Sequence, residues 1–144
     1  MQLREILRIK GNLLITTAPD EMVSDGVSIM SEKGIGSLVV MSQERLVGML
    51  TLREILQALH GNKGSIQGLR VDAVMVKNPM TIAPGVEVDE LRSVMLEHHI
   101  RYMPVMDGDT LIGVLSFHDV ARAALEEQVF ENRMLKGYIK DTPA

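Results

Sequence analysis

Two short motifs pair a hydroxyl side chain with a carboxylate three positions later: Thr51 with Glu54, and Ser116 with Asp119. At a helix start this spacing forms a capping box, in which the hydroxyl and the carboxylate each accept a hydrogen bond from a backbone N–H. A helix start also offers unpaired N–H groups and the positive end of the helix dipole to a phosphate. A carboxylate there accepts the two hydroxyls of a ribose, while the Ser or Thr hydroxyl donates to phosphate oxygens. The motif is therefore compatible with a helix cap alone and with a ribonucleotide site.

Other residues that could do chemistry are few. The chain has no cysteine, which excludes disulfides, thiolate nucleophiles and sulfur-ligated metal. His98 and His99 are neighbours, so on a helix they point about 100° apart and do not chelate one metal ion; no metal site is expected. The sequence contains neither a Gly-x-Ser-x-Gly elbow nor a phosphate-loop motif with a lysine. We therefore expect a protein that is not an enzyme and has no catalytic cofactor.

The composition indicates a single soluble domain. Its 144 residues, 46% of them hydrophobic, suffice for one compact core. A net charge of −4 and the presence of two Tyr, two Phe and no Trp argue against a nucleic-acid interface. No hydrophobic run approaches the roughly 20 residues that span a bilayer, and the first residues lack the pattern of a signal peptide. We expect a cytoplasmic protein with neither nucleic-acid nor membrane partners.

The sequence contains an internal repeat. Pro84 lies as far from Pro19 as Gly113 lies from Gly48, 65 positions in each case. At this offset ITTAPDEMVSDGVSIMSEKGIGSLVVM aligns with MTIAPGVEVDELRSVMLEHHIRYMPVM without a gap. Because prolines, glycines and apolar positions all coincide, the pattern indicates a duplicated structural unit.

Each copy is expected to form the same five elements. A short strand ends at a proline, and apolar residues at helical spacing follow it. Two short apolar runs separated by turn residues, 37–41 and 46–50 in the first copy, then predict a β-hairpin. A second helix is expected to begin near Leu52 in the first copy and near Phe117 in the second. The predicted fold class is therefore α+β, with two β-α-β-β-α units.

The sequence divides into four segments. Glycines within residues 61–68 predict a flexible link between the copies. Apolar residues four positions apart, Phe130 and Met134, continue the last helix past the second copy. The predicted boundaries are 1–62 for the first repeat, 63–71 for the linker, 72–125 for the second repeat and 126–144 for a C-terminal helix extension and tail.

Three stretches of the second copy, MTIAP, HIRYMPV and GVLSFHD, carry a family resemblance. With them the two-copy arrangement resembles a pair of CBS domains, as in the small stand-alone bacterial members of that family. The resemblance implies two repeats related by a pseudo-two-fold axis, and a homodimer. It also implies an adenine nucleotide ligand, AMP, ADP or ATP and in some members NAD(H) or S-adenosylmethionine, bound between the two sheets.

The resemblance implies a nucleotide site in the second copy. The family's ribose carboxylate falls on Asp119 and its phosphate-contacting hydroxyl on Ser116, while Arg101 and Tyr102 fall where basic residues approach the phosphate. His118, beside the carboxylate, is either a ligand contact or a solvent-facing residue. The full set expected in this copy is Thr81, Ile82, Arg101, Tyr102, Met103, Pro104, Ser116, His118 and Asp119.

The first copy carries a second, less complete set. Glu54 replaces the Asp, Val39 replaces the proline of a hydrophobic-proline step, and Gly36 supplies no basic group. The longer Glu54 side chain favours capping of its own helix, and Arg53 could supply the missing charge. This weaker set comprises Thr16, Thr17, Gly36, Ser37, Leu38, Thr51, Arg53 and Glu54.

Together these features predict a non-catalytic regulatory module that binds an adenine nucleotide between its repeats. Nucleotide binding is expected to change the conformation that the module presents to an effector protein, which the sequence does not identify. The degraded motif of the first copy keeps an alternative open, a structural dimerisation module without a functional ligand site.

Overall fold

The computed structural model describes residues 1–11 and 13–141, with side chains up to residue 137, and its first repeat has the predicted β-α-β-β-α order. A parallel strand, a helix, an antiparallel hairpin and a second helix follow one another along the chain. They are β1 (Thr16–Thr17), α2 (Val23–Lys33), β2 (Ser37–Ser42), β3 (Arg45–Thr51) and α3 (Leu52–Gly61).

The second repeat has the same order with a shorter first strand. That strand is reduced to a parallel bridge between Ile82 and Val105. The remaining elements are α5 (Val88–His98), β5 (Tyr102–Asp107), β6 (Thr110–Ser116) and α6 (Phe117–Asp141). Both second helices begin at the predicted residues, Leu52 and Phe117. The α+β class and the duplicated unit are thus confirmed.

The two hairpins have the same strand register. Ser37 pairs with Thr51 at the open end of the first hairpin, and Tyr102 pairs with Ser116 at the equivalent place in the second. Each hairpin has a register shift after a valine, between Val40 and Met41 and at the equivalent position of the second. Such a bulge increases the local twist of a strand pair. The duplication therefore extends to irregularities of the backbone.

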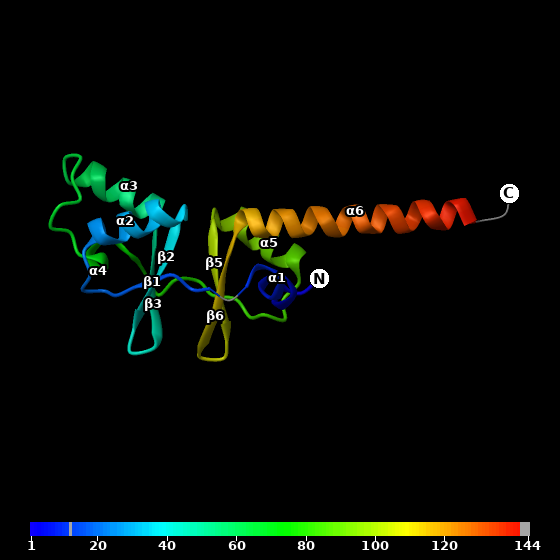
Figure 1. The fold of residues 1–144 in the computed structure, drawn as a ribbon, viewed down its shortest axis with the longest axis horizontal. Helices are drawn as coiled ribbons and strands as arrows, with labels where there is room; N and C mark the ends of the chain where they lie inside the picture. Colours follow the sequence, from blue (N-terminus) through cyan, green and yellow to red (C-terminus); the bar gives the residue numbers. More distant parts are fainter. Residues whose placement is uncertain (12, 142–144) are drawn as a thin grey trace.

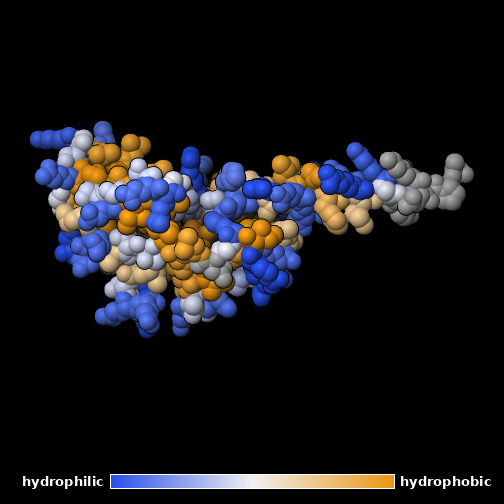
Figure 2. All heavy atoms as spheres, viewed as in Figure 1, coloured by the Kyte–Doolittle hydropathy of each residue, from blue (hydrophilic) through white to orange (hydrophobic). Residues whose placement is uncertain are grey.

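The hairpins of the two repeats lie side by side in the middle of the molecule, and the helices cover their outer faces (Figure 1). A cluster built on Val39, Met49 and Leu111 joins the two sheets. Hydrophobic side chains gather on the visible surface where the repeats meet (Figure 2). The central contact is therefore apolar, and it sets the position of one repeat relative to the other.

The short segments that precede the repeats are exchanged between the two cores. Helix α1 (Leu3–Lys10) buries Leu3 and Leu7 in the core of the second repeat. Helix α4 (Val71–Val74) buries Val71 in the core of the first, and β4 (Val76–Lys77) extends the first sheet. The exchange is reciprocal, because the Leu3 N–H donates to Val86 O at 2.9 Å and the Val71 N–H donates to Glu21 O at 2.8 Å. The predicted division at residues 62 and 72 describes the repeat in the sequence; in space each core also includes a helix from outside its own repeat.

Helix α6 is 25 residues long and continues well beyond the second repeat (Figure 1). The predicted extension over 126–144 is helical as far as Asp141, and residues 142–144 lie outside the described part of the chain. Among the described residues, no helix has the length and apolar character needed to cross a membrane.

Candidate functional site

A cavity of about 720 Å³ lies between the two repeats. The first repeat contributes the end of β3 and the first turns of α3, and the second contributes the segment between α5 and β5. The chain between the repeats closes a third side. The lining residues are Met49, Thr51, Leu52, Arg53, Glu54, Leu56, Val76, Pro79, Met80, His98, His99, Ile100, Arg101 and Tyr102.

The first-repeat wall contains the motif of Thr51 and Glu54. Thr51 is the N-cap residue of α3, yet its side chain makes no capping bond. Its hydroxyl instead donates to Glu54 Oε1 at 2.6 Å. Glu54 therefore does not close the capping box that its sequence pattern favoured. Its carboxylate and the first turn of α3 both face the cavity, in a position to meet a polar ligand.

The second-repeat wall is basic. His98, His99 and Arg101 line the same cavity as Glu54, and each of the three side chains is exposed. His99 ends α5 in the left-handed region, with φ of 54°. At the same place after α2 stands Gly34, with φ of 63°. A left-handed conformation costs a non-glycine residue of order 1–3 kcal/mol, and such residues concentrate at functional sites.

Tyr102 connects the two repeats at the edge of the cavity. Its ring lies over Gly36 of the first repeat, where any Cβ would overlap the tyrosine hydroxyl. Gly36 O accepts a hydrogen bond from Leu52 N at 3.1 Å, which ties this point to the start of α3. Gly36 therefore has to be a glycine for reasons of packing, because the Tyr102 side chain occupies the space that a Cβ would fill.

The second copy of the motif has a different arrangement. The Ser116 N–H donates to Asp119 Oδ2 at 2.9 Å, and the Asp119 N–H donates to Ser116 Oγ at 3.0 Å, so the capping box is complete. Lys10, at the end of α1, donates from Nζ to Asp119 Oδ2 at 2.6 Å and to Val114 O at 3.0 Å. This carboxylate, which the resemblance assigns to a ribose, is thus already paired.

The environment of Asp119 shifts its acidity. Partial burial acts to raise the pKa of the carboxyl, but hydrogen bonds and charge from Lys10, together with hydrogen bonds from Ser116, outweigh burial and lower the pKa below its ordinary value. The ionised form is therefore the one that the fold stabilises.

The remaining expected residues lie away from the cavity lining. Leu38 and Met103 are fully buried in the cores of their own repeats. Thr16 and Thr17 form β1 and pair with β2, while Ile82 bridges to β5. Thr81 and His118 are exposed, Pro104 is buried and Ser37 is partly buried. The structure thus brings together Thr51, Arg53 and Glu54 from the first set with Arg101 and Tyr102 from the second.

Several cavity residues were not anticipated from the sequence. The sequence raised His98 and His99 only as metal ligands, although His99 is the first residue of the HIRYMPV stretch and His98 directly precedes it. Pro79 and Met80 come from the chain that links the repeats. Outside the cavity, Lys10, which binds Asp119, comes from a helix that the repeat does not include. The proximity of the histidines to Arg101 was the signal available in the sequence. For Lys10 there was none, because 109 positions separate it from Asp119.

Comparisons with known proteins agree with this architecture. A family model for the CBS domain matches residues 14–61 and 71–126. The CBS domain-containing protein CBSX3, mitochondrial, of Arabidopsis thaliana is 30% identical over 126 residues, 84% of this chain and 61% of that protein. The chain spans only 21–25% of two matching inosine-5′-monophosphate dehydrogenases, from Korarchaeum cryptofilum and Nitrosopumilus maritimus.

Solved structures share the fold. A CBS-domain containing protein from Agrobacterium tumefaciens superposes with a TM-score of 0.82 and 25% identity, covering 86% of this chain and 99% of that one. A CBS domain pair solved in complex with 5′-methylthioadenosine and S-adenosyl-L-methionine superposes with a TM-score of 0.75 and 23% identity, covering 88% and 98% of the two chains. With both repeats matched over well more than half of its length, the chain belongs to the CBS domain family.

Proposed function

We propose that this chain is a non-catalytic regulatory module that binds an adenine nucleotide in the cavity between its repeats. One observation carries the proposal: a single cavity is lined by a carboxylate from the first repeat, Glu54, by basic side chains of the second repeat that include Arg101, and by apolar side chains. Its volume of about 720 Å³ lies within the roughly 300–1,000 Å³ of small-molecule sites. The adenosine-containing ligands of a CBS pair with the same fold are consistent with the proposal.

The ribose, the phosphate and the base of a nucleotide each match one part of the cavity lining. Glu54 is a strong acceptor for two adjacent ribose hydroxyls. Arg53 and Arg101 supply fixed positive charge for phosphate. The apolar wall of Met49, Leu56 and other side chains offers a dry surface to the base. A nucleoside phosphate uses all three walls, whereas a bare phosphate or a free base uses only one.

The cavity between the repeats, with Glu54 as the ribose acceptor, is proposed as the principal site, although the sequence motif is more complete in the second repeat. Lys10 Nζ and the Ser116 N–H both bind Asp119 Oδ2, so a ribose that uses both oxygens of this carboxylate has to displace one of these donors. Breaking a charge-assisted hydrogen bond costs about 1.5–3 kcal/mol. We therefore expect weaker nucleotide binding at the Asp119 motif than at Glu54.

The module would transmit binding by a change in the packing of its repeats. A ligand that touches Glu54 of the first repeat and Arg101 of the second bridges them, and it favours whichever arrangement keeps both contacts. Tyr102 packs against Gly36 where the two repeats meet, so it would move when the packing of the repeats changes. Because longer relatives carry further sequence beyond the matched region, the proposed effector is a separate or attached protein domain.

Calorimetric titration with AMP, ADP, ATP, NADH and S-adenosylmethionine tests the proposal. We expect at least one of them to bind the wild-type chain, and Glu54→Gln to weaken that binding about 10-fold or more, because a charge-assisted hydrogen bond of about 1.5–3 kcal/mol is lost. Arg101→Met should weaken binding of the phosphorylated ligands more than that of S-adenosylmethionine.

Matched variants at the second motif provide the control. Asp119→Asn should leave the main binding event within about 2-fold of wild type, since a paired carboxylate elsewhere contributes little to it. Lys10→Met should reveal or strengthen a second event. If Asp119→Asn abolishes binding and Glu54→Gln does not, the second repeat is the principal site. Absence of heat with all five ligands would refute nucleotide sensing altogether.

A further inference from the structure

The turn between the first helix and the hairpin carries different side chains in the two repeats. It reads KGIG over residues 33–36 and HHIR over residues 98–101. The isoleucine is common to both turns and packs against the core of its own repeat. The two glycines of the first turn are replaced in the second by His99 and Arg101, which both line the cavity. Basic side chains thus stand in the second repeat at positions where the same fold forms with glycine.

His99 occupies a position that favours glycine. Its φ is 54°, and the φ of the equivalent Gly34 is 63°. Glycine adopts this left-handed conformation freely, whereas a residue with a side chain is strained in it. The turn itself therefore gains nothing from the imidazole. A strained residue that lines a cavity indicates a function in that cavity.

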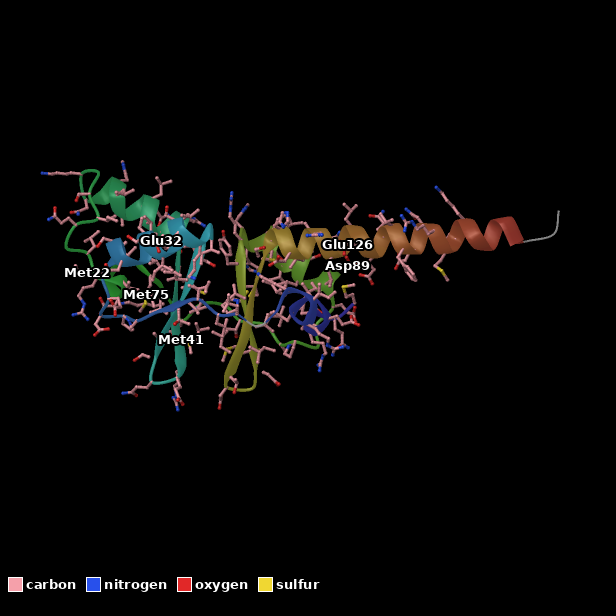
Figure 3. All side chains as sticks on the ribbon, viewed as in Figure 1. Met22, Glu32, Met41, Met75, Asp89 and Glu126 are labelled. Atoms are coloured by element: carbon pink, nitrogen blue, oxygen red, sulfur yellow. The ribbon has the colours of Figure 1, made fainter. Side chains whose placement is uncertain are left out.

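Both histidines stand at the C-terminal end of α5. His98 is the last residue of the helix and His99 is its C-cap. Asp89, in the first turn, lies on the side of the second repeat away from the first (Figure 3), so the helix ends toward the cavity. The C-terminal end of a helix has a negative partial charge, which repels phosphate. Neutral imidazoles leave this repulsion in place, whereas protonated imidazoles offset it and donate hydrogen bonds from both ring nitrogens.

The charges around the histidines favour an anionic ligand once the imidazoles are protonated. Among the described residues, neither imidazole takes part in a side-chain hydrogen bond or an ion pair. The other ionisable side chains that line the cavity or adjoin its lining in sequence are Arg53, Glu54, Lys77, Glu97, Arg101 and Tyr102. In the lining itself the arginines exceed the carboxylate by one positive charge, and protonation of both histidines raises the excess to three.

We propose that His98 and His99 make this site proton-linked, so that the imidazoles gain protons when a phosphorylated ligand enters and the ligand binds more tightly as pH falls. The inference rests on the proposed nucleotide site and adds its regulation by pH. Imidazole is the side chain that ordinarily changes charge between about pH 5 and 8. A phosphate favours the protonated imidazole, and the coupling is reciprocal, because protonated imidazole favours phosphate equally. S-adenosylmethionine has a cationic sulfonium, so acidification shifts the preference of the site toward phosphorylated ligands.

Calorimetric titration of the full chain with ATP, from about pH 8 to about pH 6, tests the inference. The wild-type affinity should rise about 10-fold toward the acidic end, which is the effect of one fully coupled proton over one pH unit. The affinity for S-adenosylmethionine should show no such rise. At one pH, the observed heat of ATP binding should differ between buffers of different ionisation enthalpy, because protons pass from the buffer to the protein.

Variants at the two histidines separate their protonation from that of the ligand. Phosphate groups also titrate near about pH 6, but they do so equally with every variant. His98→Gln/His99→Gly removes both imidazoles, and glycine suits the backbone at this turn, as Gly34 shows in the first repeat. The double variant should bind ATP about 10-fold more weakly than wild type near pH 6, and the difference should shrink toward higher pH.

Two comparisons exclude a merely structural role for the histidines. His99→Gly alone should keep or raise the thermal stability while it reduces the pH dependence of ATP binding; a structural role predicts lower stability and unchanged pH dependence. His60→Gln is the matched control, because His60 is exposed in the last turn of α3 and lies outside the cavity lining. Its pH profile should match that of wild type.

Inorganic tripolyphosphate, which has neither ribose nor base, distinguishes this inference from the proposed function. Tighter binding of tripolyphosphate to wild type toward acidic pH, lost in the double variant, would support the assignment of the histidines even when no nucleotide binds. The same pH dependence of ATP binding in wild type and in the double variant would overturn the assignment and leave nucleotide binding standing. Absence of binding by ATP and tripolyphosphate alike would overturn both.

Discussion

The carboxylate residues of the duplicated motif, Glu54 and Asp119, differ in length by one methylene group, and they make different contacts. Asp119 completes a capping box and binds Lys10, whereas Glu54 accepts from Thr51 and faces a cavity. Because an Asp at this position reaches the N–H of its own N-cap residue, we expect Asp119 to serve stability. Glu54 remains available to a ligand.

Asp119→Asn should lower the free energy of unfolding by about 1–2 kcal/mol at neutral pH, because a cap and a charge-assisted hydrogen bond are weakened. The pKa of Asp119 in the folded protein lies below the value of about 3.9 for an unfolded chain. The carboxylate therefore stabilises the fold above pH ~4, and this stabilisation is lost as pH falls through the folded-state pKa. Urea unfolding across acidic pH should show a shallower pH dependence for Asp119→Asn than for wild type; identical curves would contradict the assignment. Lys10→Met should reproduce part of the loss at neutral pH.

At the scale of elements, Gly48 and Gly113 occupy equivalent places in β3 and β6 but meet different neighbours. A Cβ at Gly48 would lie 2.5 Å from Met75 Sδ and 2.8 Å from the backbone oxygen of Val76, in the adjacent strand β4. A Cβ at Gly113 would lie 2.5 Å from a Leu7 methyl group, with no backbone atom so near. Backbone atoms yield less than the end of a side chain, because strand pairing holds them.

Gly48→Ala should therefore lower the free energy of unfolding by about 1–3 kcal/mol, the usual cost of overpacking. Gly113→Ala should cost clearly less, since rotation of the Leu7 side chain can relieve the contact. Denaturant midpoints of the two variants, measured side by side, provide the comparison. An equal or larger loss in Gly113→Ala would mean that the α1 helix is held as rigidly as the β3–β4 pair.

At the scale of the whole molecule, the exchanged helices make each core depend on a segment from outside its own repeat. Leu3 is fully buried in the core of the second repeat, although it precedes the first. Leu3→Ala should cost about 2–5 kcal/mol and lower a single cooperative transition seen equally by all probes. Exposed Ile9 on the same helix, at 82% exposure, offers the control Ile9→Ala with little effect. Two separate transitions, of which Leu3→Ala moves only one, would mean that the repeats unfold independently.

Local patterns in the sequence determined the duplicated unit, the hairpins and the starts of α3 and α6. Helical periodicity and turn residues are local patterns, and the repeat appears when the sequence is compared with itself at an offset of 65 residues. All three can therefore be recognised without coordinates. Only the tertiary structure showed that α1 packs in the core of the second repeat. It also showed that Tyr102 packs against Gly36 and that Lys10 pairs with Asp119. An amphipathic helix specifies that it will be buried but not against what. For that reason the sequence identified both carboxylates of the motif, but only the packing of distant segments left Glu54 facing a cavity and Asp119 paired.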